Sequence, residues 1–175
     1  ATLPGMRERT VMISSTGKTF ALTGWKVGFA CAPPAVTHAL RMSHQFITFC
    51  NGTPFQHAMA AALAAPDDYY RRFLAEYRGR RDRLAAGLER AGFTILPAGG
   101  TYYLVADVRP LAAEDGEAFC RSLPARTGVA AIPLSSFCAE PGAVRPLVRF
   151  AFCKKDATID EATRRLVAAF GRTDA

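Results

Sequence analysis

The sequence predicts an α/β fold in which short strands alternate with amphipathic helices. Short runs of apolar and β-branched residues stand between glycines and prolines, which is typical of strands. Apolar residues recur at helical spacing in the segments that separate these runs. Half of the 175 residues are apolar, which is ample for a buried core.

The first part of the chain is expected to contain two strands and two helices. Residues 10–14 and 26–32 are apolar runs, and we expect both to be buried strands of a sheet covered on both faces. A loop that carries Lys18 joins them. Helices are expected over residues 33–46 and 54–64, because proline is tolerated in a first helical turn.

A long basic helix is expected from Asp67 to near Gly92, with a domain boundary inside it near residue 75. The remaining elements are expected to be four strands (93–96, 101–106, 129–132 and 147–153) and two helices (113–123 and 159–170).

The net charge of +7 does not indicate nucleic-acid binding, because much of it lies in this one helix. Its arginines alternate with apolar residues at helical spacing, and Glu76 and Arg80 form an i,i+4 pair. Both features are typical of a solvated helix face.

The cysteines and the apolar segments bear on localisation. Five cysteines are widely spaced with no CxxC pair, so we expect reduced thiols that mostly fill core space. No apolar stretch approaches the ~18 residues of a membrane helix, and we expect a soluble cytoplasmic protein. Residue 1 is alanine rather than methionine, so we expect a fragment or a processed chain.

The segment SSTGKTFALTGWKVG, residues 14–28, allows two interpretations of Lys18. A nucleotide-phosphate loop of the type GxxxxGK[ST] would need glycine at position 12, which is Met12, and an uninterrupted helix after the lysine. Both conditions fail, because position 12 is not glycine and because Thr23 and Gly24 interrupt the segment within six residues of Lys18. The alternative is a lysine bound covalently to a phosphorylated aldehyde, with Ser15 and Lys26 as donors to its phosphate group.

The same segment resembles the signature S-x-x-K-x-x-x-x-x-G-x-[RK]-x-G of class I/II pyridoxal-phosphate aminotransferases of fold type I. Further matches follow in order at residues 32–34, 54–56, 80–82, 99–103 and 148–154, so the resemblance covers essentially the whole chain. It implies pyridoxal 5'-phosphate as cofactor. It also implies the C-terminal part of a fold type I enzyme: residues 1–75 ending the large cofactor-binding domain, and residues 76–175 forming the small domain.

The resemblance assigns roles residue by residue. Lys18 resembles the lysine that binds the cofactor covalently and then acts as general base and acid. Ser15 and Lys26 resemble the phosphate ligands, although arginine is more common at the position of Lys26. Arg149 resembles the arginine that binds the substrate α-carboxylate, and Phe49 resembles a residue that reaches a partner subunit's site. We expect a homodimer that binds neither nucleic acid nor membrane.

The implied reaction is transamination between an amino acid and a 2-oxo acid. The nearest subgroup contains kynurenine/glutamine, methionine and N-succinyldiaminopimelate aminotransferases, which implies N-succinyldiaminopimelate or an aromatic or methionine-type amino donor. An N-terminal half, with the glycine-containing phosphate turn and the Asp that protonates the pyridine nitrogen, would lie outside this chain. Two alternatives stay open: a pyridoxal-phosphate C–S β-lyase, and a non-catalytic interaction domain.

Overall fold

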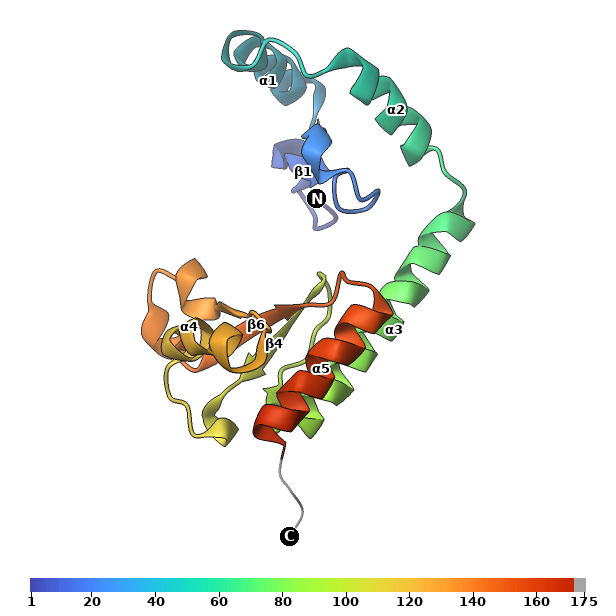
Figure 1. The fold of residues 1–175 in the computed structure, drawn as a ribbon. Helices are drawn as coiled ribbons and strands as arrows, with labels where there is room; N and C mark the ends of the chain where they lie inside the picture. The colour runs from blue at the N-terminus through green and yellow to red at the C-terminus, as the bar shows by residue number, and fades with distance from the viewer. Residues whose placement is uncertain (172–175) are drawn as a thin grey trace. The chain divides into compact units, whose positions relative to one another are not determined.

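The computed structural model describes residues 1–171, and their contacts divide the chain into two compact units. The first unit ends at Asp67 and the second begins at Asp68 (Figure 1). This division falls at the start of the long helix rather than near residue 75. Each unit is described by itself below.

In the first unit, β1 (Met12–Ser15) and β2 (Gly28–Cys31) pair in antiparallel fashion, with Ser15 opposite Gly28. The prediction that both strands are buried was wrong, since every residue of the two strands is exposed. The reason is that β1 and β2 form a sheet of two strands within the described residues. The buried apolar side chains of this unit are Val27 and Met59.

Two helices complete the first unit. Helix α1 (Pro34–Ile47) and helix α2 (Thr53–Leu63) both carry proline in the first turn, as predicted. Large apolar side chains at the end of α1 are exposed, with 86% of Phe46 and 82% of Ile47 accessible to solvent. This unit therefore presents much apolar surface.

The second unit is built on a four-stranded antiparallel sheet in the order β3-β4-β6-β5. The strands are β3 (Thr94–Ile95), β4 (Tyr103–Asp107), β5 (Ile132–Pro133) and β6 (Leu147–Ala151). Side chains alternate along the two central strands. Leu104 and Ala106 of β4, and Val148 and Phe150 of β6, are buried in the core of this unit.

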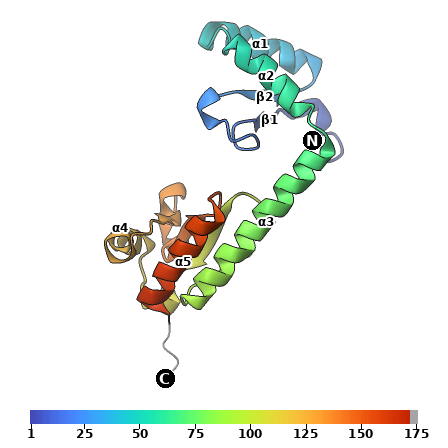
Figure 2. The ribbon, with the colours of Figure 1, turned by 45° about the vertical axis from the view of Figure 1, so that its right-hand side comes forward.

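Three helices contribute to the core on this face: α3 (Asp67–Arg90), α4 (Gly116–Thr127) and α5 (Asp156–Phe170). Helices α3 and α5 lie side by side in both views (Figures 1 and 2). An ion pair joins them, with Arg83 Nη1 2.9 Å from Asp160 Oδ1. The predicted Glu76–Arg80 pair is present at 3.5 Å. Part of the basic charge of α3 is thus neutralised by acidic residues on α5.

Five short 3₁₀ helices lie within the connections: Arg7–Arg9, Thr23–Trp25, Arg109–Leu111, Leu134–Phe137 and Pro141–Val144. The one at Leu134–Phe137, labelled η4, matters for the site described below.

The cysteines are free thiols, but the prediction that most fill core space was wrong. Cys120 is buried and Cys153 is half-buried, whereas Cys31, Cys50 and Cys138 are exposed. Three of them occupy strand ends or loops rather than the core-facing side of an element. Among the described residues, no helix is both long and apolar enough to cross a membrane.

Candidate active site

Lys18 lies on the loop that connects β1 to β2, and backbone hydrogen bonds close the two ends of this loop. Thr16 donates from its backbone N–H and from its hydroxyl to the carbonyl oxygen of Val27, at 3.2 and 2.8 Å. Both residues are buried. The loop is therefore held at a fixed base, from which Lys18 is exposed to solvent.

Two glycines allow the close backbone approach at this base. A Cβ atom on Gly28 would lie 2.7 Å from the carbonyl oxygen of Ser14, closer than real contacts permit. A Cβ on Gly17 would lie 3.1 Å from Cα of Thr23. Gly28, which pairs with Ser15, and Gly17, which precedes Lys18, thus permit a close backbone approach that larger residues would prevent.

The three residues predicted to bind cofactor sit around this base. Ser15 pairs with Gly28 across the ladder, Thr16 bonds to Val27, and Lys26 is the residue before Val27. The side chains of Ser15, Lys18 and Lys26 are exposed. All three residues thus belong to the end of β1 and the loop that joins it to β2.

The backbone of Lys26 is fixed in an uncommon conformation. It has φ of 55°, in the left-handed region, directly after the 3₁₀ helix Thr23–Trp25. Its carbonyl oxygen accepts a hydrogen bond from Nδ2 of Asn51 at 3.3 Å, and the ring of Trp25 stacks on Phe55 with centroids 4.7 Å apart. Contacts from the start of α2 and the residues before it therefore hold Lys26 in place.

The local backbone also excludes a nucleotide-phosphate loop. Lys18 is followed by turns and then by the three-residue 3₁₀ helix at Thr23, not by an α-helix. The N-terminal dipole of a helix, which such a loop uses to bind phosphate, is absent from the segment after Lys18.

Arg149 belongs to the second unit, at the centre of its sheet. It lies in β6 opposite Val105 on one side and Ile132 on the other. Because side chains alternate along a strand, Arg149 lies on the face opposite the buried Val148 and Phe150. Arg149 is half-buried there, on the face that the core helices leave uncovered.

Among the residues that the structure describes, aromatic rings and not a carboxylate contact the Arg149 guanidinium. Its Cζ lies 4.2 Å from the ring centre of Tyr103 and 4.0 Å from that of Phe137. Nε of Arg149 is buried and has no hydrogen-bond partner among the described residues. An unpartnered donor of this kind is costly, and a ligand carboxylate would satisfy it.

Neither ring was among the predicted site residues. Tyr103 resembles a core aromatic in the sequence. Its hydroxyl is hydrogen-bonded to that of Tyr102 at 3.3 Å, and this bond together with burial raises the pKa of Tyr102 to about 12. One signal could have identified Tyr103, since it is two residues from the strand partner of Arg149 and so shares its face. No comparable sequence signal identifies Phe137, which comes from η4.

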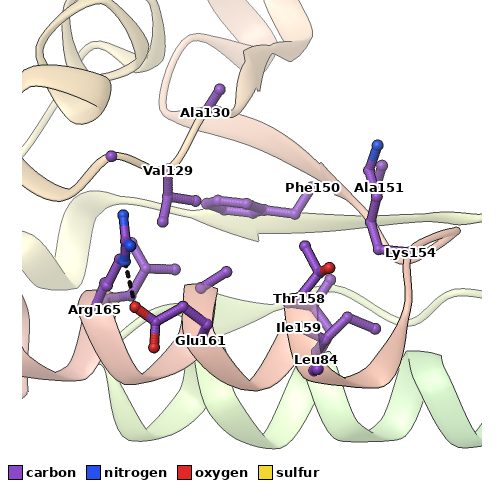
Figure 3. A pocket seen from close by; sticks show the side chains of 14 residues that line it. Leu84, Val129, Ala130, Phe150, Ala151, Lys154, Thr158, Ile159, Glu161 and Arg165 are labelled. Atoms are coloured by element: carbon purple, nitrogen blue, oxygen red, sulfur yellow. Dashed lines mark hydrogen bonds and ion pairs between the residues drawn. The ribbon is translucent and has the colours of Figure 1, made fainter.

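A pocket of about 610 Å³ lies elsewhere in the second unit (Figure 3). It opens between α5, the segment before β5 and the end of β6, and it is lined by residues such as Val129, Phe150 and Ile159. Glu161 and Arg165 form an ion pair at 2.7 Å on its wall (Figure 3). Phe150 faces this pocket from the helix-covered side of the sheet, so the pocket is separate from Arg149.

Comparison with known proteins gives a consistent result. A family model described as aminotransferase class I and II matches residues 2–166. A probable N-succinyldiaminopimelate aminotransferase of Mycobacterium tuberculosis is 47% identical over 171 residues, and a methionine aminotransferase of Escherichia coli is 43% identical over 163 residues. Each alignment covers 93% of this chain, but only 43% and 42% of the respective relative.

Solved structures agree with the sequence comparison. The N-succinyldiaminopimelate aminotransferase of Mycobacterium tuberculosis has a TM-score of 0.91, covering 97% of this chain and 44% of that one. The Escherichia coli methionine aminotransferase has a TM-score of 0.88. The predicted fold class is thereby confirmed, and members of this family use pyridoxal phosphate. The chain belongs to the class I and II aminotransferase family and spans a little under half the length of these relatives.

Proposed function

We propose that this chain is the C-terminal part of an aminotransferase that exchanges an amino group between an amino acid and a 2-oxo acid, with pyridoxal phosphate as cofactor. The observation that supports the proposal is that Ser15, Lys18 and Lys26 belong to the strand end and the loop that the Thr16–Val27 hydrogen bonds close. Residues 14–28 contain no acidic side chain. A hydroxyl and two amines suit an aldehyde that carries a phosphate group.

Each residue has a separate task in this proposal. When bound, pyridoxal phosphate supplies an electron sink for the carbanion formed at the substrate Cα. Nζ of Lys18 would hold the cofactor through its aldehyde carbon, and once the substrate amine had displaced it, the free Lys18 amine would take up the proton lost from the substrate Cα. The Ser15 hydroxyl donates to the phosphate, since Ser15 Oγ accepts only the Gly17 N–H, at 3.2 Å, among the contacts described. The ammonium group of Lys26 neutralises part of the phosphate charge.

Arg149 binds the substrate α-carboxylate in this proposal. A guanidinium can donate two parallel hydrogen bonds to a carboxylate, and Nε of Arg149 lacks a partner of its own. Replacement by alanine should therefore raise KM strongly, by about tenfold or more, because charge-assisted hydrogen bonds contribute about 1.5–3 kcal/mol.

Substrate, assembly and compartment are further parts of the proposal. The printed names of the relatives support an amino donor in the range of N-succinyldiaminopimelate, methionine or kynurenine. A homodimer is supported by the exposed apolar residues at the end of α1 and by Phe49, which is 77% exposed at φ 66°. Free thiols are compatible with the cytoplasm.

The decisive test is chemical trapping at Lys18. The complete protein is incubated with pyridoxal phosphate, treated with borohydride and digested, and the modified peptide is identified by mass spectrometry. We expect the label on Lys18, and its loss in Lys18→Arg while Lys154 and Lys155 serve as internal controls. A label distributed equally over the exposed lysines would contradict the proposal.

Two further results separate the alternatives. An in-frame coding sequence before Ala1 that supplies a phosphate turn and a pyridine-binding Asp would support the enzyme, whereas a stop codon directly before Ala1 would favour a non-catalytic domain. For the complete protein, pyruvate and thiol released from cystathionine without a 2-oxo acid would favour the β-lyase.

A further inference from the structure

Two rings from different elements contact the Arg149 guanidinium. Tyr103 comes from β4 and Phe137 from the last residue of η4, at 4.2 and 4.0 Å from Cζ. The backbone of Arg149 is fixed in the centre of the sheet by pairing on both sides. Arginine has many rotamers, and contact with a ring on a separate element selects among them.

Three other arginines in the second unit are paired differently. Arg83, Arg109 and Arg145 each have a carboxylate within 3.1 Å, which occupies their N–H groups. Within the described residues of the second unit, no carboxylate is paired with Arg149. Rings stack on the flat face of a guanidinium and leave the N–H groups along its edge available for a carboxylate.

The burial of the two rings indicates what they do. Phe137 is 57% exposed, so its ring contributes little to a hydrophobic core. Tyr103 is itself held by Tyr102, with ring centroids 4.3 Å apart and the two hydroxyls hydrogen-bonded at 3.3 Å. One ring is thus rigidly supported and the other covers the guanidinium from a surface segment.

We infer that Phe137 and Tyr103 are positioning residues that hold the Arg149 guanidinium for a substrate carboxylate. This inference rests on the proposed function of Arg149 and adds to it the source of the guanidinium's orientation. The two rings restrict the orientation of the guanidinium, whose Nε has no hydrogen-bond partner among the described residues. Loss of either ring lets the side chain adopt other rotamers, and the carboxylate then has to select the competent one.

The test measures carboxylate recognition separately from folding and catalysis. The probes are 3-phenylpropionate, which has a carboxylate but no amino group to react, and 3-phenylpropionamide, which has the same shape without the charge. Binding of both to the complete cofactor-loaded protein is measured by calorimetry. Phe137→Leu and Tyr103→Leu should each weaken 3-phenylpropionate about threefold to tenfold, the range of one cation–π contact, and leave 3-phenylpropionamide unchanged.

Ring-retaining variants provide the rescue. Phe137→Tyr and Tyr103→Phe should bind 3-phenylpropionate within about twofold of the unmodified protein, because the rings stay in place. Phe73→Leu is the matched control, since it removes the same ring from a tilted contact with Tyr77 within α3. It should change neither probe.

The outcomes separate this inference from the proposal on which it rests. Equal weakening of both probes by Phe137→Leu would overturn it, because that result describes a general structural change. Weakening by Tyr103→Phe as large as that by Tyr103→Leu would also overturn it, since the hydroxyl and not the ring would then be responsible. If 3-phenylpropionate does not bind more weakly to Arg149→Ala, the carboxylate role of Arg149 itself fails.

Discussion

Replacing Gly87 by alanine is expected to destabilise the second unit, because the added methyl group would collide with Thr163 where α3 packs against α5. Gly87 is buried on α3, and a Cβ atom there would lie 2.1 Å from Cγ2 and 2.5 Å from Cβ of Thr163 on α5. Ordinary van der Waals contact begins at 3.4 Å. Thr163 is itself buried and donates its hydroxyl to the carbonyl oxygen of Asp160 at 3.0 Å. Cβ of Thr163 cannot rotate away, so α5 must shift.

Two opposing terms set the magnitude of the change. Alanine is favoured over glycine in a helix by about 1 kcal/mol. Overpacking a buried site costs about 1–3 kcal/mol and more when the backbone has to move. The second term is the larger here, because the ion pair between Arg83 and Asp160 also resists separation of α3 and α5. We expect Gly87→Ala to lower the free energy of unfolding by about 2 kcal/mol.

Gly79 offers a matched control on the same helix. It is exposed, and a Cβ atom there would meet nothing within 4 Å. Gly79→Ala should therefore raise the free energy of unfolding by about 0.5–1 kcal/mol, the helix-propensity term alone. Urea unfolding followed by far-ultraviolet circular dichroism measures both variants. Thr163→Ser, which removes Cγ2, should recover part of the loss in Gly87→Ala. Equal stabilisation by both alanines would refute the proposed packing.

Three further perturbations test other parts of the molecule. Gly28→Ala, with its Cβ 2.7 Å from the carbonyl oxygen of Ser14, should weaken pyridoxal phosphate binding about tenfold in an absorbance titration, whereas Gly24→Ala, with open space around it, should not. Arg109 holds the pKa of the Asp107 carboxyl below its usual range. The stability from this pair is therefore present above the unfolded pKa of about 4, and it is lost as the pH falls through the folded pKa. Asp107→Asn should accordingly be less stable than the unmodified protein at pH 7, and its free energy of unfolding should fall less on acidification. Equal acid sensitivity of the two proteins would contradict this. Hydrogen exchange of the 175-residue chain should show protected amides in β4 and β6 and fast exchange in β1 and β2, and equal protection would contradict the difference in burial described above.

Local signals predicted most helices well because their determinants lie within a few residues. Proline in the first turn located α1 and α2, and Gly92, with φ 93°, ends α3 where the sequence indicated. Helix α4 was expected over 113–123 but runs from Gly116 to Thr127. Its start is set by Asp115, whose side chain accepts hydrogen bonds from two backbone N–H groups, and it continues through Pro124.

Long-range features were predicted less well. Strand β5 was expected over 129–132 but occupies Ile132–Pro133, because its extent depends on pairing with β6. The environment of Arg149 likewise depends on η4, which is sequence-distant and carries no periodic signal. The sequence motif therefore identified the candidate site residues themselves. The rings that surround Arg149 could be identified only from the folded structure.

The two units that carry Arg149 and Lys18 differ in how many residues they bury. The second unit has a core of fifteen buried apolar residues around β4 and β6, which pair with each other along their full length, and Arg149 lies on the opposite face of this sheet. The Lys18 loop is instead held by local hydrogen bonds, two close glycine contacts and the Trp25–Phe55 stack, and its buried residues are Thr16, Gly17 and Val27. The buried core of the first unit is so small that it offsets little of the conformational entropy lost when residues 1–67 become ordered. Cofactor binding at Lys18 should consequently stabilise its own loop by mass action. Under the proposed function, cofactor binding would therefore add stability to the first unit, which has few buried residues, and would add less to the second unit, which has its own buried core.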